Sequence, residues 1–242
     1  QVKSDARNRK LISIDATCPL VTKVHAEAIR YAKRGWQILL VGHKNHQEVI
    51  GTYGEAPDSI QIVESPDDIP NLKIVDEHKL VYLTQTTLSI DDAELIINAL
   101  KEAFPHINAP PSDDICYATT NRQLAVRDQA EEVDLVLVIG SNNSSNSLRL
   151  TEIAHAVDTP SHLIDDVSML NSEWLEGVQS VLITAGASAP ERLVKELVMH
   201  LVEHYNGVAP EEIDFDEGMS FSMPASFKSF ISSKLTFEGE EQ

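Results

Sequence analysis

Cysteine is scarce in this sequence, which has only Cys18 and Cys116 among its 242 residues. Two cysteines exclude a disulfide-stabilised scaffold, and a zinc ribbon would need four thiolates at short spacing. The two thiols are therefore either unreactive or part of a cluster whose other ligands come from elsewhere. A length of 242 residues corresponds to one large or two ordinary domains, enough to bury a sizeable core.

Basic residues and long hydrophobic runs are also in short supply. The chain has 19 Lys and Arg against 38 Asp and Glu, which gives a formal net charge of −19 and a pI near 4.7. Such a charge repels nucleic acid and anionic lipid, so we predict that neither is a partner. Apolar runs such as residues 38–41 are too short to span a bilayer, and no secretory signal opens the sequence. These absences predict a soluble, cytoplasmic protein.

Two short patterns at the start indicate that the sequence begins inside a domain. Residues 1–10 are typical of the end of a polar helix, and residues 11–14 are typical of a short strand. No initiating Met precedes them. We therefore expect further sequence upstream.

An internal repeat organises most of the chain. Cys18 aligns with Cys116, and Gly42 aligns with Gly140 at the same displacement. An aspartate-bearing segment precedes each cysteine, and a helical segment and an apolar strand follow it. Further on, a strand ending at Thr84 aligns with one ending at Thr184. Any two α/β domains resemble each other, but these matched positions favour a true repeat.

The repeat predicts an α/β fold with tandem homologous domains. About four strand-like runs alternate with helices in each copy, which is typical of parallel sheets with right-handed crossovers. We place the two domains at residues 19–112 and 113–206. Polar loops follow the buried strands, at the carboxyl ends where open α/β sheets bind ligands.

Both cysteines are predicted to lie at helix N-termini. Cys18 precedes Pro19, a residue favoured at the first helical position, and Cys116 also precedes a helical segment. The helix dipole stabilises a thiolate there, which suits a metal ligand. Isolated cysteines are more often small buried hydrophobic residues, but the equivalence of these two in a repeat favours ligands.

Polar helix starts provide candidate anion-binding residues. Neither a Walker motif nor a GxGxxG motif is present, so other donors would have to bind phosphate. Ser144, Ser145 and Asn146 open one predicted helix, and Ser188 opens another in a capping-box pattern. A helix cap explains Ser188 equally well, whereas three consecutive polar residues exceed what a cap needs.

His46 and Glu48 follow the predicted strand that ends at Gly42. A histidine can donate a hydrogen bond to phosphate, and a shielded carboxylic acid can deliver a proton at neutral pH. A histidine and a glutamate in a surface loop are more often simply solvated. The residue types alone do not decide between the two interpretations.

Five motifs, in order along the chain, resemble the 4-hydroxy-3-methylbut-2-enyl diphosphate reductase family. These LytB-type iron-sulfur reductases act last in the methylerythritol phosphate route to isoprenoids. The resemblance covers about residues 1–205, and the tail at 207–242, for which we predict one strand followed by disorder, matches weakly. The motifs are DATCPLVTKVH (15–25), TQTTLS (84–89), DICYATTNRQ (114–123), GSNNSSNS (140–147) and TAGASAP (184–190).

The resemblance implies three similar α/β domains in a pseudo-threefold arrangement around a central [4Fe-4S] cluster. Residues 1–18 would then be the remnant of a truncated first domain, followed by the second and third. Cys18 and Cys116 would be two cluster ligands, and the third cysteine would lie upstream of this chain. Ferredoxin or flavodoxin would supply the electrons.

The resemblance also implies a reaction and roles around its substrate. The reaction is the reductive dehydroxylation of 4-hydroxy-3-methylbut-2-enyl diphosphate to isopentenyl and dimethylallyl diphosphate. Glu48 would be the proton source. The residues that would bind substrate are His46, Thr86, Ser144, Ser145, Asn146 and Ser188, with Thr87 and Thr119 nearby.

Two departures from the family pattern qualify these implications. Gln47 stands where the family usually has proline, and the family's first cysteine and two of its histidines have no counterpart. We therefore expect the truncated chain to be inactive by itself. Two other hypotheses stay open: a non-catalytic diphosphate-binding fragment without a cluster, and a thiol redox pair if Cys18 and Cys116 reach disulfide distance.

Overall fold

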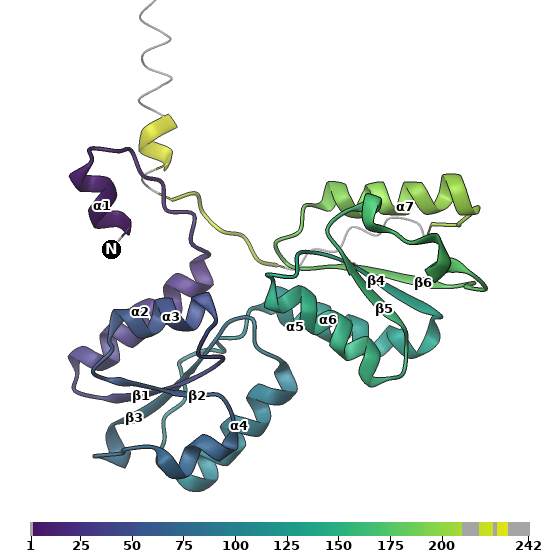
Figure 1. Ribbon diagram of the computed structural model, residues 1–242. Coiled ribbons are helices and arrows are strands. Elements are labelled where there is room, and N and C mark those ends of the chain that lie inside the picture. Colours follow the sequence, from purple (N-terminus) through teal and green to yellow (C-terminus); the bar gives the residue numbers. More distant parts are fainter. Residues whose placement is uncertain (1, 210–217, 225–226, 232–242) are drawn as a thin grey trace, which may run out of the picture. The chain divides into compact units, whose positions relative to one another are not determined.

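The computed structural model describes residues 2–209, 218–224 and 227–231 (Figure 1). The described residues divide into two compact units, one that includes residues 2–22, 218–224 and 227–231 and one that includes residues 23–209. In the first unit, α1 (Val2–Asn8) confirms the polar helix expected at the start. Residues 11–14 form no strand, so that prediction is wrong. They are exposed, and an isolated strand without a paired neighbour leaves its backbone to water.

The second unit contains two parallel three-stranded sheets, both visible in Figure 1. The first has the strand order β2-β1-β3, and α2 and α3 pack on one face while α4 packs on the other. Its elements are α2 (Pro19–Lys33), β1 (Gln37–Val41), α3 (Gln47–Glu55), β2 (Ile60–Val63), β3 (Leu80–Thr84) and α4 (Ile90–Ala103).

The second sheet repeats this plan. Its order is β5-β4-β6, with α5 and α6 on one face and α7 on the other. Its elements are α5 (Tyr117–Gln129), β4 (Leu135–Ile139), α6 (Ser145–Ala156), β5 (Ser161–Ile164), β6 (Val181–Ala185) and α7 (Glu191–Tyr205). Short 3-10 helices complete the loops at Pro66–Asn71, Glu77–Lys79, Ala130–Glu132, Val167–Met169 and Ser172–Leu175.

The central strands explain why the sheets are covered on both faces. All of β1 except Gln37 and all of β4 are buried, and both central strands are mostly Leu, Val and Ile. A strand that is apolar on both sides needs helices on both sides, which is the usual state of a parallel sheet. The parallel α/β prediction is confirmed, although each sheet has three strands in the described residues rather than about four.

Strand pairing corrects the alignment between the two repeats by one residue. Val41 of β1 lies opposite Thr84, and its counterpart Ile139 lies opposite Ala185 rather than Thr184. The backbone N–H of Gln85 bonds Val41 O at 2.9 Å, just as that of Gly186 bonds Ile139 O at 2.9 Å. The similar runs VYLT and VLIT hid this shift, because sequence similarity does not report hydrogen-bond register.

The tail after α7 differs from its prediction where it is described. Residues 218–224 lack regular secondary structure and residues 227–231 are helical, so no strand occurs in those segments. The rest of the tail lies outside the described residues. Across the described part of the chain, no helix combines the length and hydrophobicity required to cross a membrane.

Candidate functional site

The Glu48 carboxylate is held by three donors at the carboxyl end of the first sheet. Oε2 accepts from the backbone N–H of Thr86 at 2.9 Å and from its hydroxyl at 2.7 Å, and Oε1 accepts from the Thr87 hydroxyl at 3.1 Å. Glu48 lies in the first turn of α3, whereas the threonines follow β3. The structure therefore brings together residues that are far apart in the sequence, and the carboxylate is half-buried.

Gln85 and Gly42 support this arrangement. Gln85 Nε2 donates to the Thr87 hydroxyl at 2.9 Å, which leaves that hydroxyl free to donate to Glu48. Gln85 Oε1 accepts from the His43 backbone N–H at 3.2 Å. A Cβ at Gly42 would lie 2.9 Å from Gln85 Cβ, so only glycine allows this close approach.

His46 caps α3 and is pre-set as a hydrogen-bond donor. Its Nδ1 accepts from the Glu48 backbone N–H at 3.3 Å. Because Nδ1 is an acceptor, the neutral ring carries its proton on Nε2 and can donate there to an anion. Burial lowers the pKa of His46, although the nearby Glu48 opposes the shift. His46 is therefore uncharged at neutral pH.

The lowered pKa of His46 predicts a stability change with pH. Unfolded histidine takes up a proton near pH 6.5, whereas folded His46 does so only at lower pH. Acidification below 6.5 therefore favours the unfolded state, and protonated Nδ1 also loses its capping bond. We expect the free energy of unfolding of the wild type, relative to His46→Asn, to fall between pH 7.5 and pH 5. Asparagine is the matched control because it caps a helix without titrating.

Urea unfolding of the two proteins across this range measures the effect. A difference that stays constant, or grows in favour of the wild type on acidification, would contradict this account of His46.

A cavity of about 220 Å³ lies at the carboxyl end of the second sheet and is lined by Ser144 and Ser188. Ser144 is the N-cap of α6 and accepts from the Ser147 backbone N–H at 3.3 Å. α7 instead begins after Pro190 and has no side-chain cap, so the capping explanation of Ser188 is wrong. The exposed Ser188 side chain lies at the cavity and not on the helix N–H groups.

Ser147 orients the Ser144 hydroxyl. Ser147 Oγ donates to Ser144 Oγ at 3.0 Å, in addition to the bond from the Ser147 N–H. Since Ser144 Oγ accepts twice, its own hydrogen is left to be donated outward, as an anion in the cavity would need. Ser147 is only 1% exposed, and a Cβ at Gly140 or Gly186 would lie 2.2 Å or 2.1 Å from its Oγ.

The other predicted substrate ligands of the second sheet have mixed surroundings. Ser145 is half-buried at the start of α6, whereas Asn146 is only 3% exposed. Neither amide atom of Asn146, nor the buried Thr119 hydroxyl, has a hydrogen-bond partner among the described residues. A buried polar group without a partner is costly, so these groups are suited to a ligand or ordered water.

Cys116 is joined by its backbone to the Glu48 group. It is the N-cap of α5, and its N–H donates to Thr86 O at 2.8 Å, while the Thr86 N–H donates to Glu48. Its side chain makes no capping bond, and the thiol is free and half-buried. The thiol therefore lies at a helix N-terminus, as the sequence predicts.

Cys18 directly precedes α2, as expected, and is free and exposed. Cys18 belongs to the first unit, whereas Cys116 belongs to the second. A free thiol beside a helix start fits a ligand of an iron-sulfur cluster, and the chain has two such thiols, Cys18 and Cys116. In the described residues, no group of three or more His, Cys, Asp or Glu side chains is placed to hold a metal ion. This chain thus offers a partial ligand set.

Several supporting residues were missed by the sequence reasoning. Ser147 directly follows the polar run 144–146, and Gln85 lies inside the TQTTLS motif, but the sequence assigns neither residue a role. Lys23 and Asp114 likewise belong to the two cysteine motifs. Gln85, Lys23 and Asp114 have partners in other elements, and Ser147 fills the space beside Gly140 and Gly186, so the sequence alone does not reveal these roles.

Comparisons with known proteins show which proteins this chain is similar to. A family model described as LytB protein matches residues 1–202. The chain is 50% identical over 226 residues to the 4-hydroxy-3-methylbut-2-enyl diphosphate reductase of Streptomyces avermitilis, covering 92% of this chain and 66% of that protein. A protein of the same name from Idiomarina loihiensis is 49% identical over 226 residues, covering 92% of this chain and 72% of that protein.

The chain is also similar, in fold and in sequence, to a solved reductase structure. The E-1-hydroxy-2-methyl-but-2-enyl-4-diphosphate reductase from Plasmodium falciparum has a TM-score of 0.84 and 39% identity, covering 97% of this chain and 74% of that chain. The chain spans about two thirds of the length of the curated relatives it matches, 66% and 72% for the two above.

Proposed function

The chain belongs to the LytB family, and we propose that it forms the second and third domains of a 4-hydroxy-3-methylbut-2-enyl diphosphate reductase. In this proposal the domains are residues 19–112 and 113–206, and residues 1–18 belong to a first domain. The reaction removes the allylic hydroxyl with two electrons and two protons. One proton leaves with the hydroxyl as water, and the other ends on carbon in isopentenyl or dimethylallyl diphosphate.

The observation that carries this proposal is the hydrogen-bonded group around Glu48. A protonated Glu48 can donate to the Thr86 or Thr87 hydroxyl, which can pass a proton onward to the substrate hydroxyl. The existing bonds of 2.7 Å and 3.1 Å need only reverse their direction. The Thr86 N–H holds the carboxylate in place during this transfer.

The diphosphate is assigned to neutral donors. His46 offers Nε2–H, Ser144 offers a hydroxyl whose acceptor positions are already used, and Ser188 lies at the same cavity as Ser144. Ser145 and Asn146 are assigned to substrate on their place in the motif, with the unpartnered Asn146 amide as support. Charge-assisted hydrogen bonds to an anion are stronger than neutral ones, so these donors suffice without lysine.

Cys18 and Cys116 would hold a [4Fe-4S] cluster together with a third cysteine outside these 242 residues. When bound, such a cluster supplies electrons and an iron site that can act as a Lewis acid. The protein residues would then orient the substrate and deliver the proton. A ferredoxin or flavodoxin is the proposed electron donor.

Turnover by the native-length protein, purified anaerobically and loaded with iron and sulfide, tests the proposal. We expect oxygen-sensitive iron-sulfur absorbance and oxidation of a dithionite-reduced dye that depends on 4-hydroxy-3-methylbut-2-enyl diphosphate. The Cys116→Ser variant is the matched control and should lose both. A folded, fully iron-loaded protein without turnover would overturn the proposal.

The partial ligand set also favours a second candidate, a diphosphate-binding fragment without a cluster. Calorimetry of isopentenyl diphosphate with the iron-free 242-residue chain separates the two. Submicromolar binding would favour the binding fragment, whereas weak or absent binding is expected if the site needs the remaining domain and its cluster.

A further inference from the structure

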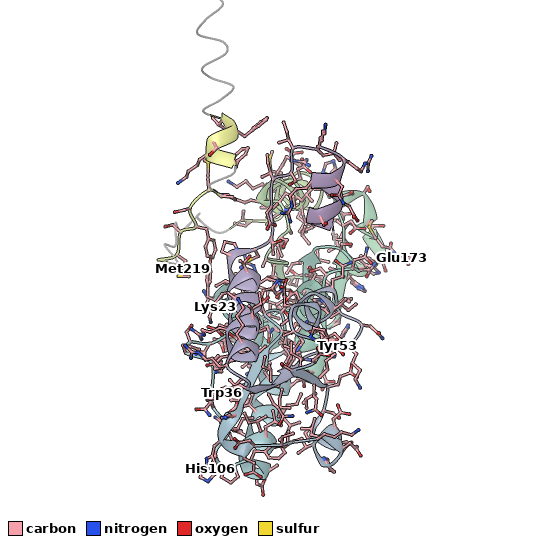
Figure 2. All side chains as sticks on the ribbon, turned by 90° about the vertical axis from the view of Figure 1, so that its left-hand side faces the viewer. Lys23, Trp36, Tyr53, His106, Glu173 and Met219 are labelled. Carbon is pink, nitrogen blue, oxygen red and sulfur yellow. The ribbon has the colours of Figure 1, made fainter. Side chains whose placement is uncertain are left out.

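A partly buried ion pair, in which the Lys23 side chain is 26% exposed, lies just before Cys116. Lys23 Nζ on α2 is 3.1 Å from Asp114 Oδ1, and the Asp114 side chain is 0% exposed. Lys23 Nζ also donates to the backbone oxygens of Ser112 and Asp113, each at 3.0 Å. Figure 2 labels Lys23 on α2. One ammonium group therefore holds three consecutive residues of the segment that leads to Cys116.

The second oxygen of Asp114 fixes the same segment to the first sheet. Asp114 Oδ2 accepts from the backbone N–H of Thr84, the last residue of β3, at 3.1 Å. The segment is thus bound to α2 through Lys23 and to β3 through Thr84. An ion pair withdrawn from water is weak evidence for stability, because apolar residues of similar volume often stabilise as much, whereas these contacts fix where the segment lies.

The segment then delivers Cys116 to the Glu48 group. Two residues beyond Asp114, the Cys116 N–H donates to Thr86 O, and the Thr86 N–H donates to Glu48. Thr86 itself lies two residues beyond Thr84. The Asp114–Thr84 and Cys116–Thr86 hydrogen bonds therefore join residues 114–116 to residues 84–86 at two points, two residues apart.

We propose that Lys23 and Asp114 are positioning residues that fix where Cys116 lies relative to Glu48, a relation we call their register. In the proposed reductase, this register would place an iron ligand relative to the proton source, and that part of the inference rests on the proposed function. The register itself does not, because it follows from contacts within the chain.

Because the buried Glu27 carboxylate also lies near Lys23, we expect replacing Lys23 to disturb the fold more than replacing Asp114. Glu27 lies one turn further along α2, is 7% exposed, and has one carboxylate oxygen without a hydrogen-bond partner in the described residues. Asp114 and Lys23 are among the charged groups that act on it. Replacing Lys23 leaves both Asp114 and Glu27 without this cation, whereas Asp114→Asn leaves Lys23 in place to act on Glu27.

The test measures alkylation of Cys116 in the native-length protein prepared without iron. Iodoacetamide labelling is followed peptide by peptide by mass spectrometry, so that Cys18 serves as an internal reference. We expect Lys23→Met and Asp114→Asn each to speed Cys116 labelling by about tenfold through easier local opening, with Cys18 unchanged. Lys44→Met is the matched control, because it removes a lysine from an exposed ion pair with Glu64 and should change neither rate.

The two substitutions separate positioning from electrostatics. They remove opposite charges, so a purely electrostatic effect on the thiol would speed labelling in one variant and slow it in the other. Opposite changes, or unchanged labelling in folded variants, would overturn the proposal.

Amide exchange provides the second measurement, which needs only Asp114→Asn if Lys23→Met does not fold. Peptides that contain the Thr86 and Cys116 amides should exchange faster than in wild type, while those from β4 should not. Unchanged exchange at these amides would contradict the proposed register. Because neither measurement requires iron or turnover, the result is independent of whether the reductase assay succeeds.

Discussion

Replacing Glu48 by glutamine is expected to lower reductase turnover by about 10²- to 10⁴-fold, the usual contribution of a general acid. Glutamine has nearly the same shape and can still accept at Oε1 from the Thr86 N–H. It has no acidic proton to deliver, and with its oxygen on Thr86 its NH₂ group faces the Thr87 hydroxyl, which in the wild type donates to the other carboxylate oxygen. The proton supply is therefore lost while the fold is retained.

The measurement is kcat and KM of the iron-loaded native-length protein with 4-hydroxy-3-methylbut-2-enyl diphosphate. The loss should fall on kcat, since Glu48 contacts Thr86 and Thr87 and is not assigned to the diphosphate. Glu55→Gln is the matched control, because it neutralises a more exposed acid on the same helix. Wild-type kcat in Glu48→Gln, with normal iron content, would remove Glu48 from the proton path.

Replacing Gly140 by alanine is expected to lower the free energy of unfolding by about 2 to 3 kcal/mol, the cost of overpacking a well-packed site. The new Cβ would lie 2.2 Å from Ser147 Oγ and 2.6 Å from Ser147 Cβ. Rotating the hydroxyl cannot relieve the contact with Cβ, so α6 or the loop after β4 has to move. That movement would also disturb the Ser144 hydroxyl at the 220 Å³ cavity.

Urea unfolding of Gly140→Ala beside Gly54→Ala checks this expectation. Gly54 lies near the end of α3, and a methyl group added there would meet no atom within 4 Å among the described residues. Alanine at this position should therefore be neutral or stabilising by up to about 1 kcal/mol. Equal stability of the two variants would mean that Ser147 does not crowd Gly140.

The alternation of apolar strands and helices predicted the parallel sheets because each signal is local. β4, for example, is an unbroken apolar run, and Ser144 caps α6 from the position next to it. The partners of the functional groups are not local. Glu48 meets Thr86 only because β1 and β3 are adjacent in the sheet, and nothing in the intervening residues specifies that distance.

Two predictions at the second sheet were wrong for related reasons. The run from Ser188 to Glu191 has the composition of a capping box, yet Pro190 becomes the N-cap, so the serine stays at the cavity. Thr184 resembles Thr84, yet pairing with β4 makes Ala185 its equivalent. Short motifs specify what a segment can do, and tertiary hydrogen bonds select among the possibilities.

The crowding of Ser147 against two glycines has a consequence for how this protein can diverge. Gly140 directly follows β4 and Gly186 directly follows β6, yet the space beside each is filled by one side chain from α6. A larger residue at either glycine becomes acceptable only after Ser147 has become smaller, and a smaller residue there frees the Ser144 hydroxyl to turn. Substitutions at the three positions therefore depend on one another. The order in which they occur decides whether the Ser144 hydroxyl keeps its orientation as a hydrogen-bond donor.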